Sequence, residues 1–235
     1  MAHLKNFLLA GTAAAFMAAA PLSAYAEDQS VTNQAETGEV ELSGQEDIAT
    51  AYDLYAYGEK NKDALAVITA AKIIATTPTT ESKTEVEEKV EDGADTTEEG
   101  EGAAAPASLD DMLATATKLS AGNETYLELI EDVKAAKPRG RLAGPGRLVK
   151  GLLAGRTHII RETFRGGRLA QITLIGDGDT NLDMVVLDQN GNAICRDRSY
   201  SDKLRCSFYP KWTGTFAIGI KNQGRIRNTY ILLTN

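Results

Sequence analysis

Histidine is nearly absent from this sequence, which contains two among 235 residues. His3 lies in a leader-like segment, so His158 alone is left for chemistry in the rest of the chain. Ser–His–Asp and Cys–His nucleophilic catalysis both need a positioned histidine. His158 stands in the pattern THIIRE, where a strand position is the ordinary interpretation. The sequence therefore gives little support to hydrolase chemistry of either kind.

Cysteine is equally scarce, and Cys195 and Cys206 are the two examples. Their spacing matches no zinc motif, whereas ten intervening residues suit one disulfide between neighbouring strands. A loop of this length would be stabilised on the order of 2–3 kcal/mol by its closure. A disulfide also implies an oxidising compartment.

Long apolar runs are missing from the region after the N-terminal segment. No later stretch approaches the roughly 20 apolar residues of a membrane-spanning helix. The glycine-rich residues 140–155 lack the Lys–Ser ending and the strand–helix setting of a phosphate-binding loop. We therefore expect neither a transmembrane segment nor a nucleotide site.

The N-terminus has the three parts of a secretory signal peptide. Lys5 supplies the positive charge, residues 7–20 form a short alanine-rich apolar stretch, and Ala24-Tyr25-Ala26 matches a cleavage site. The pattern predicts a bacterial signal peptide over residues 1–26, cleaved after Ala26. A periplasmic or secreted protein would result.

The net charge of −8 hides a strong asymmetry along the chain. Residues 27–133 contain 6 basic and 26 acidic side chains, whereas residues 134–235 contain 18 basic and 7 acidic ones. Such a chain can dock its acidic part on its basic part, self-associate, or bind an anionic envelope surface. Nucleic acid is not an expected partner, because the protein is exported and no aromatic residues interleave the arginines.

A helical region is predicted over residues 43–135. Apolar residues recur at helical spacing in four short segments, and each segment follows a residue type that caps helices. The expected caps are Ser43, with Glu46 completing a capping box, then Asp63, Ser108 and Asn123. The segments pair into two helical hairpins.

Three polar stretches interrupt or flank these helices. Residues 27–42 and the acidic, low-complexity insertion over residues 77–107 lack the apolar content to fold by themselves. Residues 136–151 form a basic linker rich in glycine and proline. We expect all three to be irregular.

A cluster of tyrosines, Tyr52, Tyr55 and Tyr57, falls in the first helical segment. A binding site is one interpretation. Packing of the helix pair is the favoured one, because aromatics at helical spacing usually belong to a core.

The period changes from helical to strand-like over residues 152–235. Seven candidate strands, separated by Gly- and Asn-rich turns, predict an antiparallel β-sandwich or jelly roll. Their sequences are THIIRETF, RLAQITLIG, NLDMVVLD, NAICR, LRCSFYP, TFAIGIKN and NTYILLTN. The predicted fold class is thus α+β, with short helical hairpins followed by the sandwich.

One loop carries closely spaced oxygen ligands: Asp177, Asp179, Asn181 and Asp183. Carboxylate and amide oxygens are what Ca²⁺ prefers. The spacing begins like an EF-hand loop, but Leu182 replaces the turn glycine and no glutamate closes the loop. A polar turn without metal is the favoured alternative.

Tyr209 and Trp212 flank Pro210 near a predicted loop. Exposed, they would form a platform for a carbohydrate or peptide. Buried, Trp212 would be the core tryptophan of the sandwich, which is the favoured interpretation because a small sandwich needs a large apolar anchor.

Four short motifs resemble bacterial pre-peptidase C-terminal (PPC-like) domains. They are AGRT at 154–157, FRGG at 164–167, GDGDTNLD at 176–183 and WTGTF at 212–216. The resemblance covers about residues 149–235. It implies a β-sandwich on a secreted protein, binding to polymers such as collagen or glycans, and stabilisation by calcium.

These features favour an exported, non-enzymatic binding protein whose sandwich recognises a polymer or protein partner. Two alternatives remain open. One is a secreted hydrolase with an unrecognised site, and the other is an envelope structural protein that assembles through its acidic and basic halves.

Overall fold

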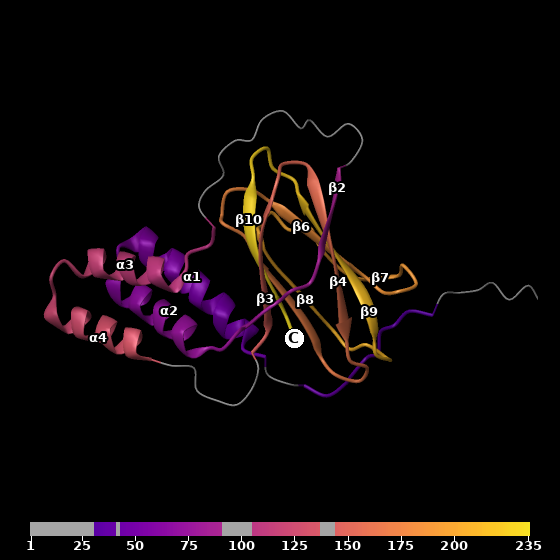
Figure 1. The fold of residues 1–235 in the computed structure, drawn as a ribbon, viewed down its shortest axis with the longest axis horizontal. Coiled ribbons are helices and arrows are strands. Elements are labelled where there is room, and N and C mark those ends of the chain that lie inside the picture. Colours follow the sequence, from indigo (N-terminus) through magenta and orange to yellow (C-terminus); the bar gives the residue numbers. More distant parts are fainter. Residues whose placement is uncertain (1–30, 41–42, 91–104, 137–143) are drawn as a thin grey trace, which may run out of the picture. The chain divides into compact units, whose positions relative to one another are not determined.

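The computed structural model describes residues 31–40, 43–90, 105–136 and 144–235. Helices precede most of the strands along the chain, and the predicted α+β class is confirmed (Figure 1). The predicted signal peptide lies outside the described residues. So do residues 91–104 of the acidic insertion and residues 137–143 of the basic linker.

The helices form two consecutive hairpins, as predicted. They are α1 (Gln45–Asn61), α2 (Ala64–Thr76), α3 (Leu109–Ser120) and α4 (Glu124–Ala135). Among the described residues, no helix is long and apolar enough to cross a membrane.

Three of the four predicted helix caps are confirmed. Asp63 accepts a hydrogen bond from the amide of Ala66, and Asn123 accepts one from the amide of Tyr126. Ser108 forms a complete capping box. Each of these caps satisfies amide donors that the first helical turn leaves unpaired.

The predicted cap at Ser43 is wrong. The N-cap of α1 is Gly44, whose φ of 75° favours glycine, and no side chain caps this helix. The Ser43 hydroxyl instead donates to Gln171 Oε1 at 3.0 Å. Gln45, buried at the helix start, also bonds to Gln171 and accepts from Thr173. A tertiary contact with the sheet therefore replaces the local cap.

The helices share one apolar cluster with a sheet face. Ile175, Ile231 and Leu233 of the sheet belong to the same cluster as the buried faces of all four helices. Burial of each such side chain contributes about 1.5–3 kcal/mol. Tyr52 is buried in this cluster, which confirms its core role, whereas Tyr57 is 55% exposed.

Within the described residues, ten strands form two five-stranded sheets. The first sheet has the order β1 (Thr80–Glu81), β3 (Gly146–Leu152), β10 (Asn228–Thr234), β5 (Ala170–Ile175) and β8 (Lys203–Phe208). The second has the order β2 (Val86–Val90), β4 (Arg156–Phe164), β9 (Gly214–Asn222), β6 (Leu182–Leu187) and β7 (Ala193–Asp197). Neighbours are antiparallel except for β1 and β3. The seven predicted strands correspond to β4 to β10.

The core between the sheets follows from alternation along the strands. In β6, every second residue is buried, and the same holds for β8. Phe164, Phe208 and Phe216 pack together at its centre, with ring centroids 4.8–5.8 Å apart. Edge-on and tilted contacts at these distances are favourable for aromatic rings. These three rings, and not Trp212, are the large apolar anchor.

The three stretches expected to be irregular contribute ordered structure. Residues 80–90, within the predicted insertion, contain β1 and β2, and the second half of the predicted linker contains most of β3. Residues 31–40 form isolated bridges, Ala35 with Tyr209 and Glu39 with Arg168. Each segment pairs its backbone with an existing strand or loop, so it needs little apolar surface of its own.

The predicted disulfide joins Cys195 to Cys206 and is confirmed. It does not link neighbours within one sheet, because β7 and β8 are edge strands of different sheets. The bond therefore closes one open side of the sandwich covalently.

Candidate binding surfaces of the sandwich

Trp212 lies at the surface, contrary to the favoured prediction. The side chain is 38% exposed and stands in the loop between β8 and β9. The loop after β4 touches this loop, since the amide of Gly166 donates to Thr213 Oγ1 at 3.0 Å. Lys211 precedes Trp212 in the chain, Arg165 precedes Gly166 on the contacting loop, and both are exposed. We call Arg165, Lys211 and Trp212 the tryptophan surface.

A buried asparagine holds the backbone of this surface. Asn33 is fully buried, and its side chain accepts from the Trp212 amide at 3.1 Å and donates to the Trp212 carbonyl at 3.0 Å. Its own amide donates to Asp188 Oδ2 at 2.9 Å. Residues 31–40 thus serve as a brace for the loop, and the backbone of Trp212 is held in place within the chain.

Asp188 is the buried carboxylate that supports this brace. Burial alone would raise its pKa. Hydrogen bonds from Asn33, Asn190 and Asn192 outweigh burial and hold the pKa below its usual value. The carboxylate is therefore stabilised in its charged form inside the β6–β7 turn.

Tyr209 does not share the exposed position of Trp212. Its carbonyl accepts from the amide of Ala35 at 2.7 Å, and its ring lies so close to Gly38 that a Cβ there would collide with it. The ring is partly covered by residues 31–40. Of the two predicted binding residues, Trp212 is thus the more accessible.

Three of the four predicted calcium ligands, Asp177, Asn181 and Asp183, accept hydrogen bonds within the protein. Asp177 accepts from the amides of Asp179 and Thr229, at 3.2 and 2.6 Å. Asn181 Oδ1 accepts from the amide of Ser201, and Asp183 accepts from Asn181 and from Gln223. These contacts fasten the loops at this end of the sandwich, as turn residues do.

One buried oxygen without a hydrogen-bond partner lies behind the same loop. Asn228 is fully buried, and its Oδ1 has no hydrogen-bond partner. Burial raises the pKa of Asp177, assisted by the charges of Asp179 and Asp202 and opposed by backbone hydrogen bonds. In the part of the chain that the structure describes, no three His, Cys, Asp or Glu side chains converge as metal ligands. Calcium binding here stays a prediction.

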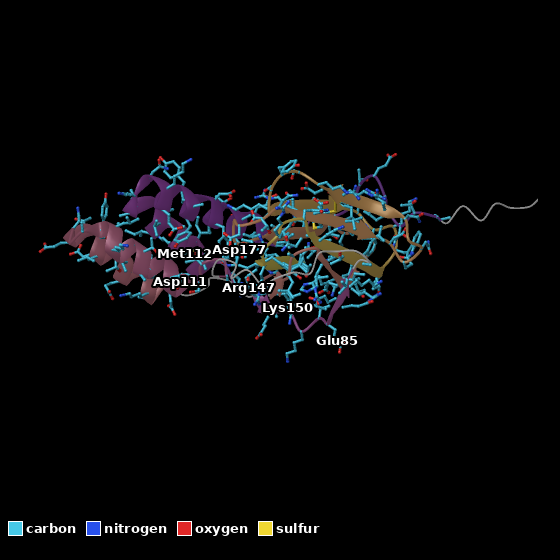
Figure 2. The ribbon with its side chains drawn as sticks, turned by 90° about the horizontal axis from the view of Figure 1, so that it is seen from above. Glu85, Asp111, Met112, Arg147, Lys150 and Asp177 are labelled. Atoms are coloured by element: carbon cyan, nitrogen blue, oxygen red, sulfur yellow. A yellow bond between two sulfur atoms is a disulfide. The ribbon has the colours of Figure 1, made fainter. Side chains whose placement is uncertain are left out.

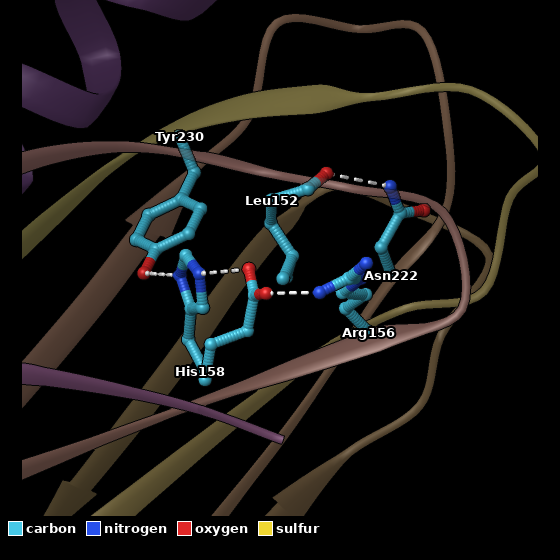
Figure 3. A network of polar contacts seen from close by, with 6 residues as sticks. Leu152, Arg156, His158, Asn222 and Tyr230 are labelled. Carbon is cyan, nitrogen blue, oxygen red and sulfur yellow. Dashed lines mark hydrogen bonds and ion pairs between the residues drawn. The ribbon is translucent and has the colours of Figure 1, made fainter. Parts of the chain in front are cut away.

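His158 occupies a buried strand position in a polar network (Figure 3). Its Nδ1 lies 2.8 Å from the Tyr230 hydroxyl, and its Nε2 lies 3.4 Å from Glu88 Oε2. Glu88 also pairs with Arg156. Burial lowers the pKa of His158, although Glu88 partly opposes this. The network joins β10, β4 and β2, and both ring nitrogens are engaged by the protein.

Two shallow hollows lie elsewhere on the first sheet. One, of about 390 Å³, is lined by residues that include Ser82, Arg147 and Lys150, and the last two belong to β3 (Figure 2). The other, of about 430 Å³, lies between α1 and β8, where Lys203 pairs with Asp53 at 2.6 Å. His158 lines neither hollow. Both are lined by side chains of both charges.

Comparison with known proteins identifies no family. No protein-family model matches the chain, and no curated protein matches it. Among solved structures, a periplasmic lysozyme inhibitor of g-type lysozyme from Aeromonas hydrophila, PliG, is 13% identical over 41% of this chain and 91% of its own, with a TM-score of 0.29.

Two further solved structures are similar at the same low level. The enzymatically active domain of bacteriophage CBA120 tailspike protein 4 is 15% identical over 42% of this chain and 16% of its own, with a TM-score of 0.25. The capsular polysaccharide assembling protein CapF from Staphylococcus aureus is 12% identical over 53% and 40%, with a TM-score of 0.23. At these TM-scores the similarity carries no functional argument.

Proposed function

We propose that this protein is an exported, non-enzymatic binding protein whose tryptophan surface recognises a carboxylated polysaccharide. The observation that supports this function is an exposed Trp212 whose backbone makes two hydrogen bonds to Asn33. The exposed Lys211 is next to it in the chain, and the exposed Arg165 belongs to the loop that contacts this one. An aromatic side chain left at the surface of a loop whose backbone is held in place is a common anchor of a binding site.

The side chains of the tryptophan surface complement an acidic sugar. The indole offers a flat apolar face with one donor at its edge, which suits a partner that is apolar on one side and polar on the other. Arg165 can donate two parallel hydrogen bonds to a carboxylate, and Lys211 adds a point charge. A neutral polymer would use the indole alone.

Export and the PPC-like resemblance support the same function. The leader-like residues 1–26 and the disulfide suit an oxidising, extracytoplasmic compartment. The resemblance implies polymer binding by the sandwich. The enzyme alternative has no comparable support, since both ring nitrogens of His158 face Tyr230 and Glu88.

The tryptophan surface can be tested with the protein's own fluorescence. Trp212 is the single tryptophan of the chain, so its emission reports on this surface alone. Titration with polygalacturonate oligomers should change the emission and protect Trp212 from acrylamide quenching. Neutral dextran should produce a weaker effect, and added salt should weaken polygalacturonate binding because it screens the two cations.

Calorimetry on variants assigns the binding to this surface. Trp212→Ala and the double change of Arg165 and Lys211 to alanine should each weaken polygalacturonate binding at least tenfold. Tyr200→Ala is the matched control, because Tyr200 is a fully exposed aromatic in a different loop. Equal loss in the Tyr200 variant would overturn the proposal, and so would binding of poly-L-glutamate without polygalacturonate, which would indicate a polypeptide partner.

A further inference from the structure

Residues 79–90 cross from one sheet to the other along the side of the sandwich opposite the disulfide. β1 pairs with β3 of the first sheet, and β2 then pairs with β4 of the second (Figure 1). We call this segment the edge strap. Without it, β3 and β4 would be neighbouring edge strands with unpaired backbone groups.

The edge strap is attached with very little apolar contact. Every residue of β2 except the half-buried Val86 is exposed, and Val86 packs against the sandwich core. The backbone pairing runs from Val86 opposite Ile160 to Val90 opposite Arg156, and Thr84 Oγ1 donates to Glu162 Oε1 at 2.6 Å. A strand held in this way is released more easily than one buried on both faces.

Charge supplies the specificity of this attachment. Glu87 pairs with Arg161 at 2.9 Å on one face of the strand. Glu88 reaches Arg156 and the buried His158 on the other face. Exposed pairs of this kind contribute little individually and weaken as salt rises. The edge of β4 is thus paired with two adjacent acidic residues that follow the half-buried Val86.

We propose that the edge of β4 is a docking site for an extended acidic segment of a partner protein, and that the edge strap is an internal occupant that competes for it. Addition of a strand to a sheet edge is a common mode of peptide recognition, with backbone bonds providing affinity and side chains providing selectivity. The occupant seen in the structure shows which chemistry fits: an extended chain with two glutamates opposite Ile159 and His158. This site lies apart from Trp212 and goes beyond the proposed polysaccharide binding.

The competition predicts how affinity should respond to the strap. A tethered strand acts at a high effective concentration, so it masks the edge from a free peptide. Weakening the strap should therefore increase the affinity for a peptide supplied in solution. Removing the cations of β4 should reduce that affinity.

The test uses a fluorescein-labelled peptide with the sequence of residues 82–90, SKTEVEEKV, and the full chain. Fluorescence anisotropy should show at least tenfold tighter binding to the E87K/E88K variant than to the unaltered protein, because the reversed charges repel Arg156 and Arg161. The E124K/E128K variant, which reverses two exposed glutamates of α4, is the matched control and should bind like the unaltered protein.

Further variants separate a loss of folding from a release of the edge strap. Circular dichroism checks that E87K/E88K is folded, and E87Q/E88Q provides a milder change whose affinity should lie between the two. Addition of R156E/R161E should abolish the gain, and a peptide with both glutamates replaced by lysine should not bind. The proposal would be overturned if the peptide bound neither E87K/E88K nor E87Q/E88Q. It would also be overturned if the lysine peptide bound as tightly as SKTEVEEKV.

Discussion

The amide of Asn33 donates a hydrogen bond to the carboxylate of Asp188, 155 residues further along the chain, at 2.9 Å. The same asparagine holds the backbone of Trp212 on both sides. One buried carboxylate therefore supports the β6–β7 turn, the brace of residues 31–40 and, through Asn33, the exposed indole. Local sequence contains no indication of this connection.

Asp188→Asn should lower the free energy of unfolding by about 2 kcal/mol at neutral pH, since the carboxylate accepts several hydrogen bonds in a buried place. The asparagine amide has the shape of the carboxylate, but its NH₂ group would face the N–H donors of Asn33, Asn190 and Asn192. Because the pKa of Asp188 is lowered on folding, its stabilisation is present above about pH 3.9 and is lost as the pH falls through the lowered value.

Urea unfolding of this variant and of the unaltered protein, at neutral and at strongly acidic pH, measures both effects. The difference between the two proteins should shrink in acid. Asp110→Asn, on the exposed start of α3, is the control. If the free energies of unfolding of the two proteins differed by the same amount at every pH, the charged carboxylate of Asp188 would not be the source of the stabilisation.

His158 should make the protein less stable in mild acid. Burial lowers its pKa in the folded state, so the unfolded chain takes up the proton first. The stability is fully present above the unfolded value near pH 6.5 and is lost as the pH falls through the lowered folded value. His158→Gln should remove this pH dependence, and an NMR titration of the imidazole should give a pKa below that of a free histidine.

Reduction of the Cys195–Cys206 bond should lower the free energy of unfolding on the order of 2–3 kcal/mol, as expected for a loop of this length. Denaturant curves with and without dithiothreitol give this value. A variant with serine at both positions should resemble the reduced protein and ignore the reductant. If dithiothreitol destabilises that variant as well, its effect does not come from the disulfide.

Calcium can be tested by thermal unfolding in excess Ca²⁺ and in EDTA. A ligand that binds only the folded state at 100 times its dissociation constant adds about 2.7 kcal/mol. If the loop holds calcium, Asp179→Ala should leave the melting temperature unchanged in EDTA and lower it in Ca²⁺. Equal melting temperatures of the unaltered protein in Ca²⁺ and in EDTA would show that the loop is a polar turn that does not bind calcium.

The order and type of most elements could be predicted from the sequence. Three helix caps and seven strands have local signals, because capping and alternation depend on residues a few positions apart. The cysteine pair was also predictable, since two cysteines allow one intramolecular bond. The cap at Ser43 was missed because its hydroxyl bonds to Gln171, far away in sequence.

The sites depend more on tertiary structure than the fold does. Trp212 was expected in the core, but three phenylalanines fill that place and leave the indole at the surface. Glu87 and Glu88 belong to a stretch whose composition predicts no strand, and the edge of β4 supplies Arg161 and Arg156 as their partners.

The sequence by itself determined the α+β class, the hairpins, the strand alternation and the asymmetric charge, because each is a property of neighbouring residues. Only the tertiary structure decided that the acidic and basic parts meet at β4, and that Asn33 supports Trp212. Both results require backbone groups and charges from distant segments to satisfy one another, and such pairing is decided by which edges and loops the folded core leaves open.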